Sequence, residues 1–109
     1  MDAETCYEIV HFTFRAEVPE DAQLAHLRAL GSWVADQPGF LWRRCYRDDD
    51  RGCWTDLVAW ANLGAARAAA GRAMAQPDLA PAMSAIEQSG MYFGHYRQII
   101  ATEHTQGTA

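Results

Sequence analysis

Four strand-like segments alternate with two helical regions along this chain, and their order is the feature that most restricts its fold. The strand-like segments are rich in aromatic and β-branched residues, whereas the helical regions repeat apolar residues at helical spacing. The expected strands span 7–15, 40–47, 53–60 and 91–100, and the expected helical segments span 19–37, 62–76 and 78–88. Two right-handed βαβ units in this order predict an α+β fold, a ferredoxin-like βαββαβ plait. Its four-stranded antiparallel sheet has strand order 4-1-3-2 and carries both helical regions on one face.

The length of 109 residues is that of one domain. We expect residues 1–101 to form it and residues 102–109 to be a flexible tail. No apolar run approaches the ~18 residues of a membrane span, and the N-terminus lacks the pattern of a secretion signal. Cys6, Cys45 and Cys53 form no CxxC spacing, which favours free thiols in a reducing cytoplasm over disulfides or a zinc site.

The charge pattern excludes several classes of function. The net charge is −5 and all nine basic residues are arginines, so the chain lacks the basic surface of a nucleic-acid-binding protein. Without lysine there is no Schiff-base chemistry. No GxGxxG or GxSxG motif occurs, which argues against a phosphate-binding loop and against serine hydrolysis.

Both faces of the predicted sheet are apolar. In the first strand Val10, Phe12 and Phe14 share one parity, and Tyr7 and Ile9 share the other. In the hairpin the parity groups are, first, Phe40, Trp42, Tyr46, Trp54, Val58 and Trp60, and second, Leu41, Cys45, Cys53, Leu57 and Ala59. Helices cover only one face of such a sheet, so we expect a homodimer packed sheet against sheet. A monomer with a modestly apolar second face is the alternative.

Asp56 is a carboxylate within an otherwise apolar strand. A buried carboxylate needs a partner, and the hairpin supplies one. Pairing of residues whose numbers sum to 100 places Arg44 opposite Asp56, whereas a sum of 99 places Arg43 there. The pair has two interpretations: an ion pair that stabilises the hairpin or the dimer, or a pocket acid that orients a phenolic hydroxyl.

His95 in the last strand and His11 in the first are candidate bases. An imidazole accepts a phenolic proton near neutral pH, although a hydrogen-bonded strand histidine would look the same in the sequence. No HxH or HxxxH spacing accompanies them, so we expect no metal site. Trp54, Trp60 and Tyr92 either line a pocket for a flat ligand or simply fill the core.

Residues 7–98 resemble the antibiotic biosynthesis monooxygenase-like proteins of the dimeric α+β barrel superfamily. The residues that carry the resemblance are Pro38-Gly39-Phe40, Trp54-x-Asp56-x-Val58-x-Trp60, the alanine-rich helix that follows, the Pro77 to Pro81 segment, and His95. The resemblance implies a homodimer with one small pocket per subunit, between the sheet and the helices.

Two activities occur among the proteins this chain resembles. The haem-degrading members use an asparagine on the first strand and a histidine in the second helical region. Here the first strand carries His11, and residues 61–90 contain no histidine. Other members oxidise polycyclic phenols without metal or flavin, using an asparagine, a tryptophan and a tyrosine. Asn62 and Trp60 lie near the corresponding stretch, and Tyr92 is a candidate for the third.

The leading hypothesis is a small dimer that binds a flat aromatic molecule and oxidises it with dioxygen, without a cofactor. His95 would be the base, and Asp56 and Arg44 would orient polar groups. Trp54 and Trp60 would line the pocket, and His11 and Tyr92 are further candidates for binding. A non-catalytic ligand-binding dimer and a cyclase or isomerase acting on a polyketide-like chain are the alternatives.

Overall fold

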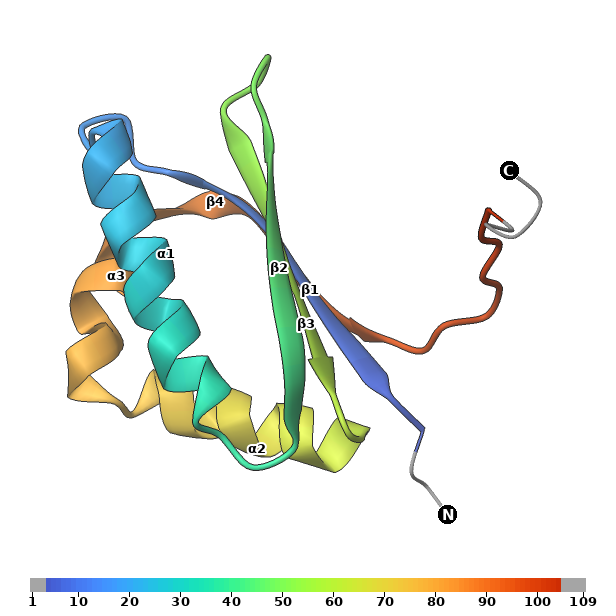
Figure 1. The fold of residues 1–109 in the computed structure, drawn as a ribbon. Coiled ribbons are helices and arrows are strands. Elements are labelled where there is room, and N and C mark those ends of the chain that lie inside the picture. Colours follow the sequence, from blue (N-terminus) through green and yellow to red (C-terminus); the bar gives the residue numbers. More distant parts are fainter. Residues whose placement is uncertain (1–3, 105–109) are drawn as a thin grey trace.

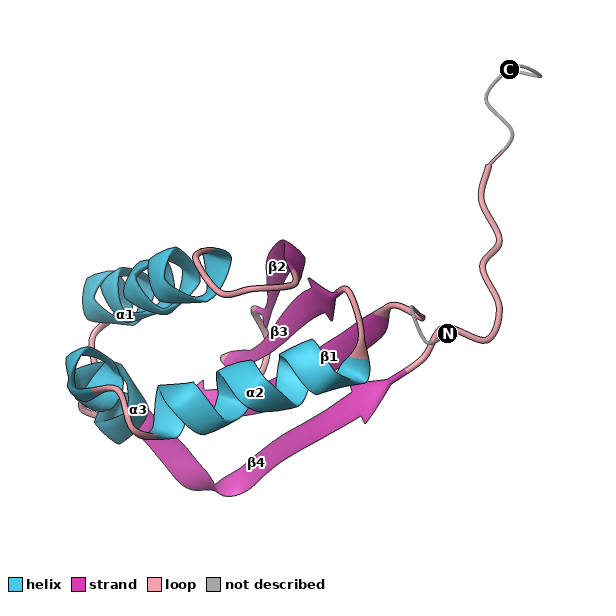
Figure 2. Ribbon diagram, turned by 90° about the horizontal axis from the view of Figure 1, so that it is seen from below, coloured by secondary structure: helices cyan, strands magenta, loops and turns pink. Residues whose placement is uncertain are grey.

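The computed structural model describes residues 4–104 and confirms the predicted order of elements (Figure 1). The strands are β1 (Cys6–Phe14), β2 (Phe40–Asp48), β3 (Cys53–Trp60) and β4 (Ile86–Tyr96). The helices are α1 (Glu20–Ala35), α2 (Leu63–Met74) and α3 (Ala80–Ala85), with a 3₁₀ turn, η1 (Pro77–Leu79), before α3. The antiparallel sheet has the order β2-β3-β1-β4, and the helices lie on one of its faces (Figure 2).

The last strand differs from the prediction. It begins at Ile86 instead of residue 91 and ends at Tyr96 instead of residue 100. Gly90 does not end the preceding helix; it lies inside β4 with a φ of 82°, where the register with β1 shifts. A glycine next to polar residues is typical of a turn, but here its conformational freedom serves a bulge within a strand. The expected helical segment 78–88 is therefore shorter and is divided into η1 and α3.

The core fills the space between the sheet and the helices, and the face of the sheet that borders it is called the inner face below. Two clusters form this core: Phe12, Phe14, Leu27, Trp54, Ala85 and Ile86, and Cys6, Val58, Trp60, Ala66 and Ala69. Ala66 and Ala69 are almost completely buried, so their small side chains let α2 approach the sheet closely. Trp60, at 1% exposure, is the largest fully buried side chain among the described residues.

The register of the hairpin corrects the expected parity groups. The irregularity between Phe40 and Trp42 shifts the pairing by one residue, so that Cys45 lies opposite Asp56. Phe40 faces the core together with Trp60, but Trp42 pairs with Ala59 and lies on the other face of the sheet. A one-residue shift exchanges the two faces of a strand, and parity alone did not reveal it.

The face of the sheet opposite the helices is called the outer face, and no described helix covers it (Figure 2). Its side chains include Tyr7, Ile9, His11, Trp42, Arg44, Tyr46, Thr55, Leu57, Tyr92 and Tyr96. Three of the tyrosines, Tyr46, Tyr92 and Tyr96, are between 39% and 55% exposed. Packing of this face against a second copy stays a prediction.

None of the helices within residues 4–104 combines the length and the apolar character that crossing a bilayer requires.

Candidate active site

A cavity of about 400 Å³, the inner cavity, lies between the inner face of the sheet and the helices. From the sheet it is lined by Glu8, Val10, Phe12, Asp56, Val58, Trp60, Ile86, Met91 and Phe93; from the helical side it is lined by Leu30, Trp33, Val34, Ala69, Ala70, Ala73, Met74, Leu79 and Met83. All of these side chains are apolar or aromatic except the carboxylates Glu8 and Asp56. A mostly apolar pocket with a few polar groups is the usual form of a small-molecule site.

Glu8 connects the inner cavity to His95. The two residues are opposite each other in the β1–β4 register, and Nε2 of His95 lies 2.9 Å from Oε2 of Glu8. The indole Nε1 of Trp60 donates to Oε1 of Glu8 at 3.4 Å. The two side chains of the Glu8–His95 pair are only 12% and 17% exposed. A shielded carboxylate–imidazole pair can hold and transfer a proton, which is the property a general base needs.

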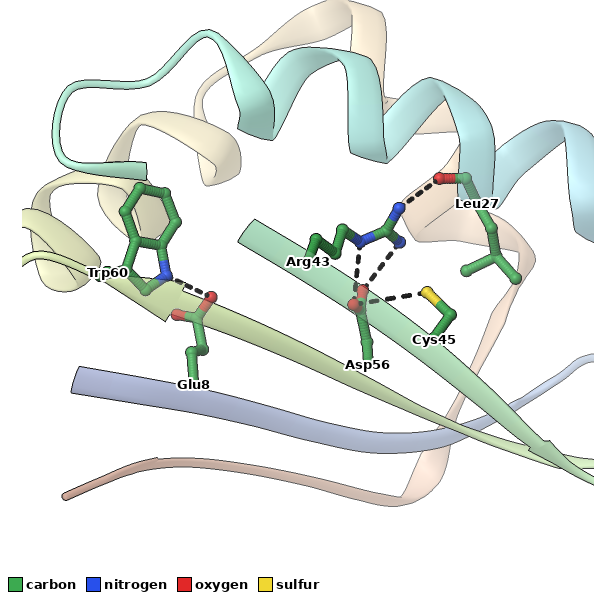
Figure 3. A network of polar contacts seen from close by, with 6 residues as sticks. All are labelled: Glu8, Leu27, Arg43, Cys45, Asp56 and Trp60. Carbon is green, nitrogen blue, oxygen red and sulfur yellow. Dashed lines mark hydrogen bonds and ion pairs between the residues drawn. The ribbon is translucent and has the colours of Figure 1, made fainter. Parts of the chain in front are cut away.

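Asp56 is held by a separate network (Figure 3). Arg43 donates from Nε and Nη2 to the two carboxylate oxygens at 2.8 and 2.9 Å, and from Nη1 to the carbonyl of Leu27 at 2.9 Å. Burial opposes the charge of Arg43, but the hydrogen bonds and negative charge of Asp56 outweigh it and raise the pKa of the guanidinium. Asp56 is therefore a neutralised, bidentate ion-pair partner that joins β3 to β2 and, through Arg43, to α1.

The thiol of Cys45 also contacts this network, donating to Oδ1 of Asp56 at 3.5 Å. Cys45 lies on the edge strand β2 and is exposed as a residue, but its sulfur points toward the carboxylate. Burial of the thiol, followed by the negative charge of Asp56, raises the pKa of Cys45 to about 11. The thiol therefore stays protonated and weakly nucleophilic at neutral pH.

The raised pKa of Cys45 predicts a loss of stability in alkaline solution. The folded chain holds the thiol proton more tightly than the unfolded chain, whose thiol has the ordinary pKa of 9.0. The contribution of the protonated Cys45 thiol to the free energy of unfolding is complete below pH 9 and is lost as the pH rises toward 11. Urea unfolding of the wild type and of Cys45→Ser across this range should show a smaller decline in the variant. An equal decline in stability in the wild type and in Cys45→Ser would show that the Cys45 thiol is not responsible.

Gly31 in α1 leaves the space that Arg43 occupies. A Cβ at this position would lie 2.5 Å from Nη1 of Arg43, which is fixed by its bond to Leu27. Replacing glycine by alanine within a helix usually stabilises it by about 1 kcal/mol. Because the added Cβ would clash with Arg43, we expect Gly31→Ala to lower the midpoint of urea unfolding instead of raising it. The same change in an Arg43→Met background should raise the midpoint relative to Arg43→Met alone, and equal effects in both backgrounds would exclude the clash.

The structure brings only some of the predicted site residues together. Asp56 and Trp60 line the inner cavity, and His95 reaches it through Glu8. The partner of Asp56 is Arg43 and not Arg44, because the shifted register turns Arg44 to the outer face. There its guanidinium lies 4.0 Å from the centre of the Trp42 ring.

His11 and Tyr92 also lie on the outer face, away from the inner cavity. Nδ1 of His11 is 2.8 Å from Oγ1 of Thr55, and the hydroxyl of Tyr96 donates to that of Tyr92 at 2.5 Å. The hydrogen bond to Tyr92 raises the pKa of Tyr96. These residues are therefore available to a partner packed on the sheet and not to a ligand in the inner cavity.

Trp54 faces the helices but does not line the inner cavity. Its Nε1 donates to Oε1 of Gln23 at 3.1 Å, and its ring belongs to the core cluster around Phe14. It borders a more open hollow of about 470 Å³, the edge groove, lined by Leu24, Leu27, Arg28, Gly31, Phe40, Arg43, Cys45 and Trp54. Trp54 is therefore a core residue that borders the edge groove and not the inner cavity.

Asn62, near the stretch where the resemblance places an asparagine, caps a helix. Its Oδ1 accepts from the backbone N–H of Ala65 at 2.8 Å, at the start of α2. The side chain thereby satisfies one of the free N–H groups of the first turn.

Glu8 is the functional candidate that sequence reasoning missed. It shares its parity with Val10, Phe12 and Phe14, so it is a carboxylate on the same apolar face of a strand. A carboxylate on an apolar strand needs a partner, and this property marks Glu8 in the sequence as clearly as it marks Asp56. His95 as its partner was not visible, because the two residues are 87 positions apart.

Within residues 4–104, no three or more histidine, cysteine, aspartate or glutamate side chains are grouped so that they could hold a metal ion.

The chain is similar to known proteins in structure and not in sequence. No protein-family model and no curated protein sequence matches it. Among solved structures, SnoaB, a cofactor-independent oxygenase from Streptomyces nogalater, superposes with a TM-score of 0.73 at 19% identity, over 94% of this chain and 100% of that chain. A candidate monooxygenase from Shewanella loihica PV-4 gives 0.70 at 19% identity, over 93% and 99%. A candidate antibiotic biosynthesis monooxygenase from Nitrosomonas europaea gives 0.69 at 12% identity, over 94% and 98%.

These identities are low, so the similarity concerns the fold. The chain has the α+β fold of the antibiotic biosynthesis monooxygenase-like proteins, as the resemblance in its sequence predicted.

Proposed function

We propose that this protein binds a flat, mostly apolar aromatic molecule in the inner cavity and oxidises it with dioxygen, without a cofactor. The observation that carries the proposal is the apolar cavity of about 400 Å³ with the Glu8–His95 pair at its wall. The same fold occurs in SnoaB, a cofactor-independent oxygenase, which supports this reaction class.

In the proposed reaction the Glu8–His95 pair accepts a proton from a phenolic substrate, and the electron-rich anion then reduces dioxygen. For an anthrone, the ring methylene becomes a carbonyl. One oxygen atom enters the product, and the other leaves as water with the two methylene hydrogens. The protein positions the substrate, excludes water and holds the proton. Trp60 forms part of the apolar wall, and the Asp56–Arg43 pair fixes the neighbouring strands.

Oxygen consumption with an anthrone substrate tests this proposal directly. We expect uptake of one dioxygen per substrate and a product that has gained one oxygen and lost two hydrogens by mass spectrometry. A product formed by loss of water alone would assign a cyclase instead, and an isomer of unchanged mass would assign an isomerase. An unaltered substrate that nevertheless binds would assign a ligand-binding protein.

The ligand-binding alternative is favoured by one specific observation. Among the described residues, every buried side-chain nitrogen or oxygen has a hydrogen-bond partner, and both carboxylate oxygens of Asp56 accept from Arg43. Satisfied polar groups are typical of a structural framework. Tight binding without oxygen uptake is the result that this alternative predicts.

The functional unit in this proposal is a homodimer that packs through the outer face. This face carries apolar and aromatic side chains and is covered by no described helix. Exposed apolar patches of this kind usually mark an interface, and a two-fold axis would pair the face with itself. We also propose a reducing compartment, the cytoplasm, because Cys6, Cys45 and Cys53 are free thiols.

The dimer predicts a particle of twice the 12.1 kDa chain mass in sedimentation equilibrium at micromolar concentration. Ile9→Arg places a charge in the middle of the outer face and should give a folded monomer, since Ile9 pairs with Leu57 and Gly94 on that face. Ala68→Arg, at an exposed position of α2, is the control and should remain dimeric. A wild-type particle of 12.1 kDa would refute the dimer.

A further inference from the structure

We infer that Glu8 contacts the ligand directly and makes the inner cavity selective for uncharged aromatic molecules that carry a hydroxyl, and against aromatic carboxylates. The inference rests on the proposed function only in taking the inner cavity as the ligand site. It adds the charge that the ligand must have and the residue that enforces it.

Glu8 has unused hydrogen-bonding capacity. A carboxylate offers about four lone-pair sites. In Glu8 two of them are used, one at Oε2 by His95 at 2.9 Å and one at Oε1 by Trp60 at 3.4 Å. The Trp60 contact is long, and the Glu8 side chain is only 12% exposed and lines the cavity. A ligand hydroxyl in the cavity would therefore find a shielded, charged acceptor.

Asp56 differs from Glu8 in this respect. Its oxygens already accept two hydrogen bonds from Arg43 and one from the thiol of Cys45. The permanent positive charge of Arg43 also neutralises it, whereas Glu8 has a histidine as its partner. Of the two carboxylates at the cavity wall, Glu8 thus has the greater free capacity for a ligand proton donor.

Within the described part of the chain, no arginine or lysine side chain lines the inner cavity, and the chain as a whole contains no lysine. Arg43 lines the edge groove and is not among the residues that line the inner cavity. A ligand carboxylate would lie in apolar surroundings beside Glu8 without a positive partner, which is strongly unfavourable. Glu8 therefore attracts a ligand hydroxyl and repels a ligand carboxylate, and both effects favour the uncharged ligand.

Titration calorimetry of the full chain with three naphthalenes of similar size tests the inference. At neutral pH, 2-naphthol donates a hydrogen bond, 2-methoxynaphthalene cannot donate one, and naphthalene-2-carboxylate is an anion. We expect 2-naphthol to bind about 10-fold more tightly than 2-methoxynaphthalene, the gain of one charge-assisted hydrogen bond. The carboxylate should bind most weakly.

Glu8→Gln keeps the shape of the side chain and removes its charge. It should reduce the preference for 2-naphthol and bring the affinity for naphthalene-2-carboxylate closer to that for 2-methoxynaphthalene. Glu17→Gln removes an exposed carboxylate between β1 and α1 and should leave the order unchanged. Because the order of affinities in the wild type is itself a test, the inference does not depend on the folding of a variant.

Three results would overturn the inference: equal affinity for 2-naphthol and 2-methoxynaphthalene, tight binding of the carboxylate, or binding of none of the three. The binding experiment needs no turnover, so it separates the inference from the proposed reaction. The expected order of affinities without oxygen uptake would support charge selection by Glu8 and refute the oxygenase. Oxygen uptake together with tight binding of the carboxylate would support the oxygenase and refute charge selection by Glu8.

Discussion

Turnover of an anthrone substrate should fall about 10²- to 10⁴-fold when His95 is replaced by alanine, which is the usual contribution of a general base. His95 lies behind Glu8, with its Nε2 2.9 Å from Oε2, and acts on the substrate through that carboxylate. We therefore expect the loss in kcat, with a small change in KM, because the cavity wall itself is retained. Oxygen-electrode measurements over a range of substrate concentrations give both constants.

A purely structural role for His95 predicts a different result. If the ring serves only to fill space, added imidazole should not restore the rate, whereas a proton-transfer role predicts partial rescue of His95→Ala by imidazole. His104→Ala, at an exposed position after β4, is the matched control and should keep the wild-type rate. An unchanged rate in His95→Ala would remove the Glu8–His95 pair from the proposed reaction.

Arg43→Ala should lower the free energy of unfolding by about 3 kcal/mol, the lower part of the range for breaking a buried ion pair. The side chains of Arg43 and Asp56 are 13% and 14% exposed, so the unpaired carboxylate would remain largely shielded from water. The hydrogen bond to the carbonyl of Leu27 in α1 would be lost as well. Urea unfolding monitored by circular dichroism measures this change.

Two further variants separate the charge effect from general damage to the hairpin. Arg51→Ala removes a pair with Asp48 in which the arginine side chain is 82% exposed, and it should change stability by less than about 1 kcal/mol. The double variant Arg43→Met with Asp56→Leu removes both charges together and should recover most of the loss in Arg43→Ala. A double variant as unstable as Arg43→Ala would show that packing, and not the buried charge, is responsible.

The need of Asp56 for a partner was predictable, but the identity of that partner was not. A carboxylate on an apolar strand indicates an ion pair wherever it occurs. The choice between Arg43 and Arg44 depends on the register of the hairpin, and the irregularity near Phe40 changes that register by one residue. The same irregularity separates Trp42 from Trp60, although both have the same parity in the sequence.

The strands β1 and β4 are a second place where the sequence did not reveal which residues are in contact. His95 and Glu8 are each recognisable as polar residues in apolar strands, yet their contact depends on pairing between segments 87 positions apart. The bulge around Gly90 adds residues to β4 and changes which of its side chains face the core, including Met91 and Phe93. His11 and Tyr92 pair with each other across the same two strands. Their place on the outer face likewise depends on long-range pairing, and local patterns could not predict it.

The sequence by itself determined the order and type of the elements and the antiparallel plait they form, because the periodicity of apolar residues is a local property of the chain. Only the tertiary structure decided that Glu8, at the wall of the inner cavity, contacts both His95 and Trp60, that Asp56 is neutralised by Arg43, and that Arg44 lies on the outer face. These contacts depend on strand register and bulges, which are fixed by packing between distant segments and by no local pattern of residues.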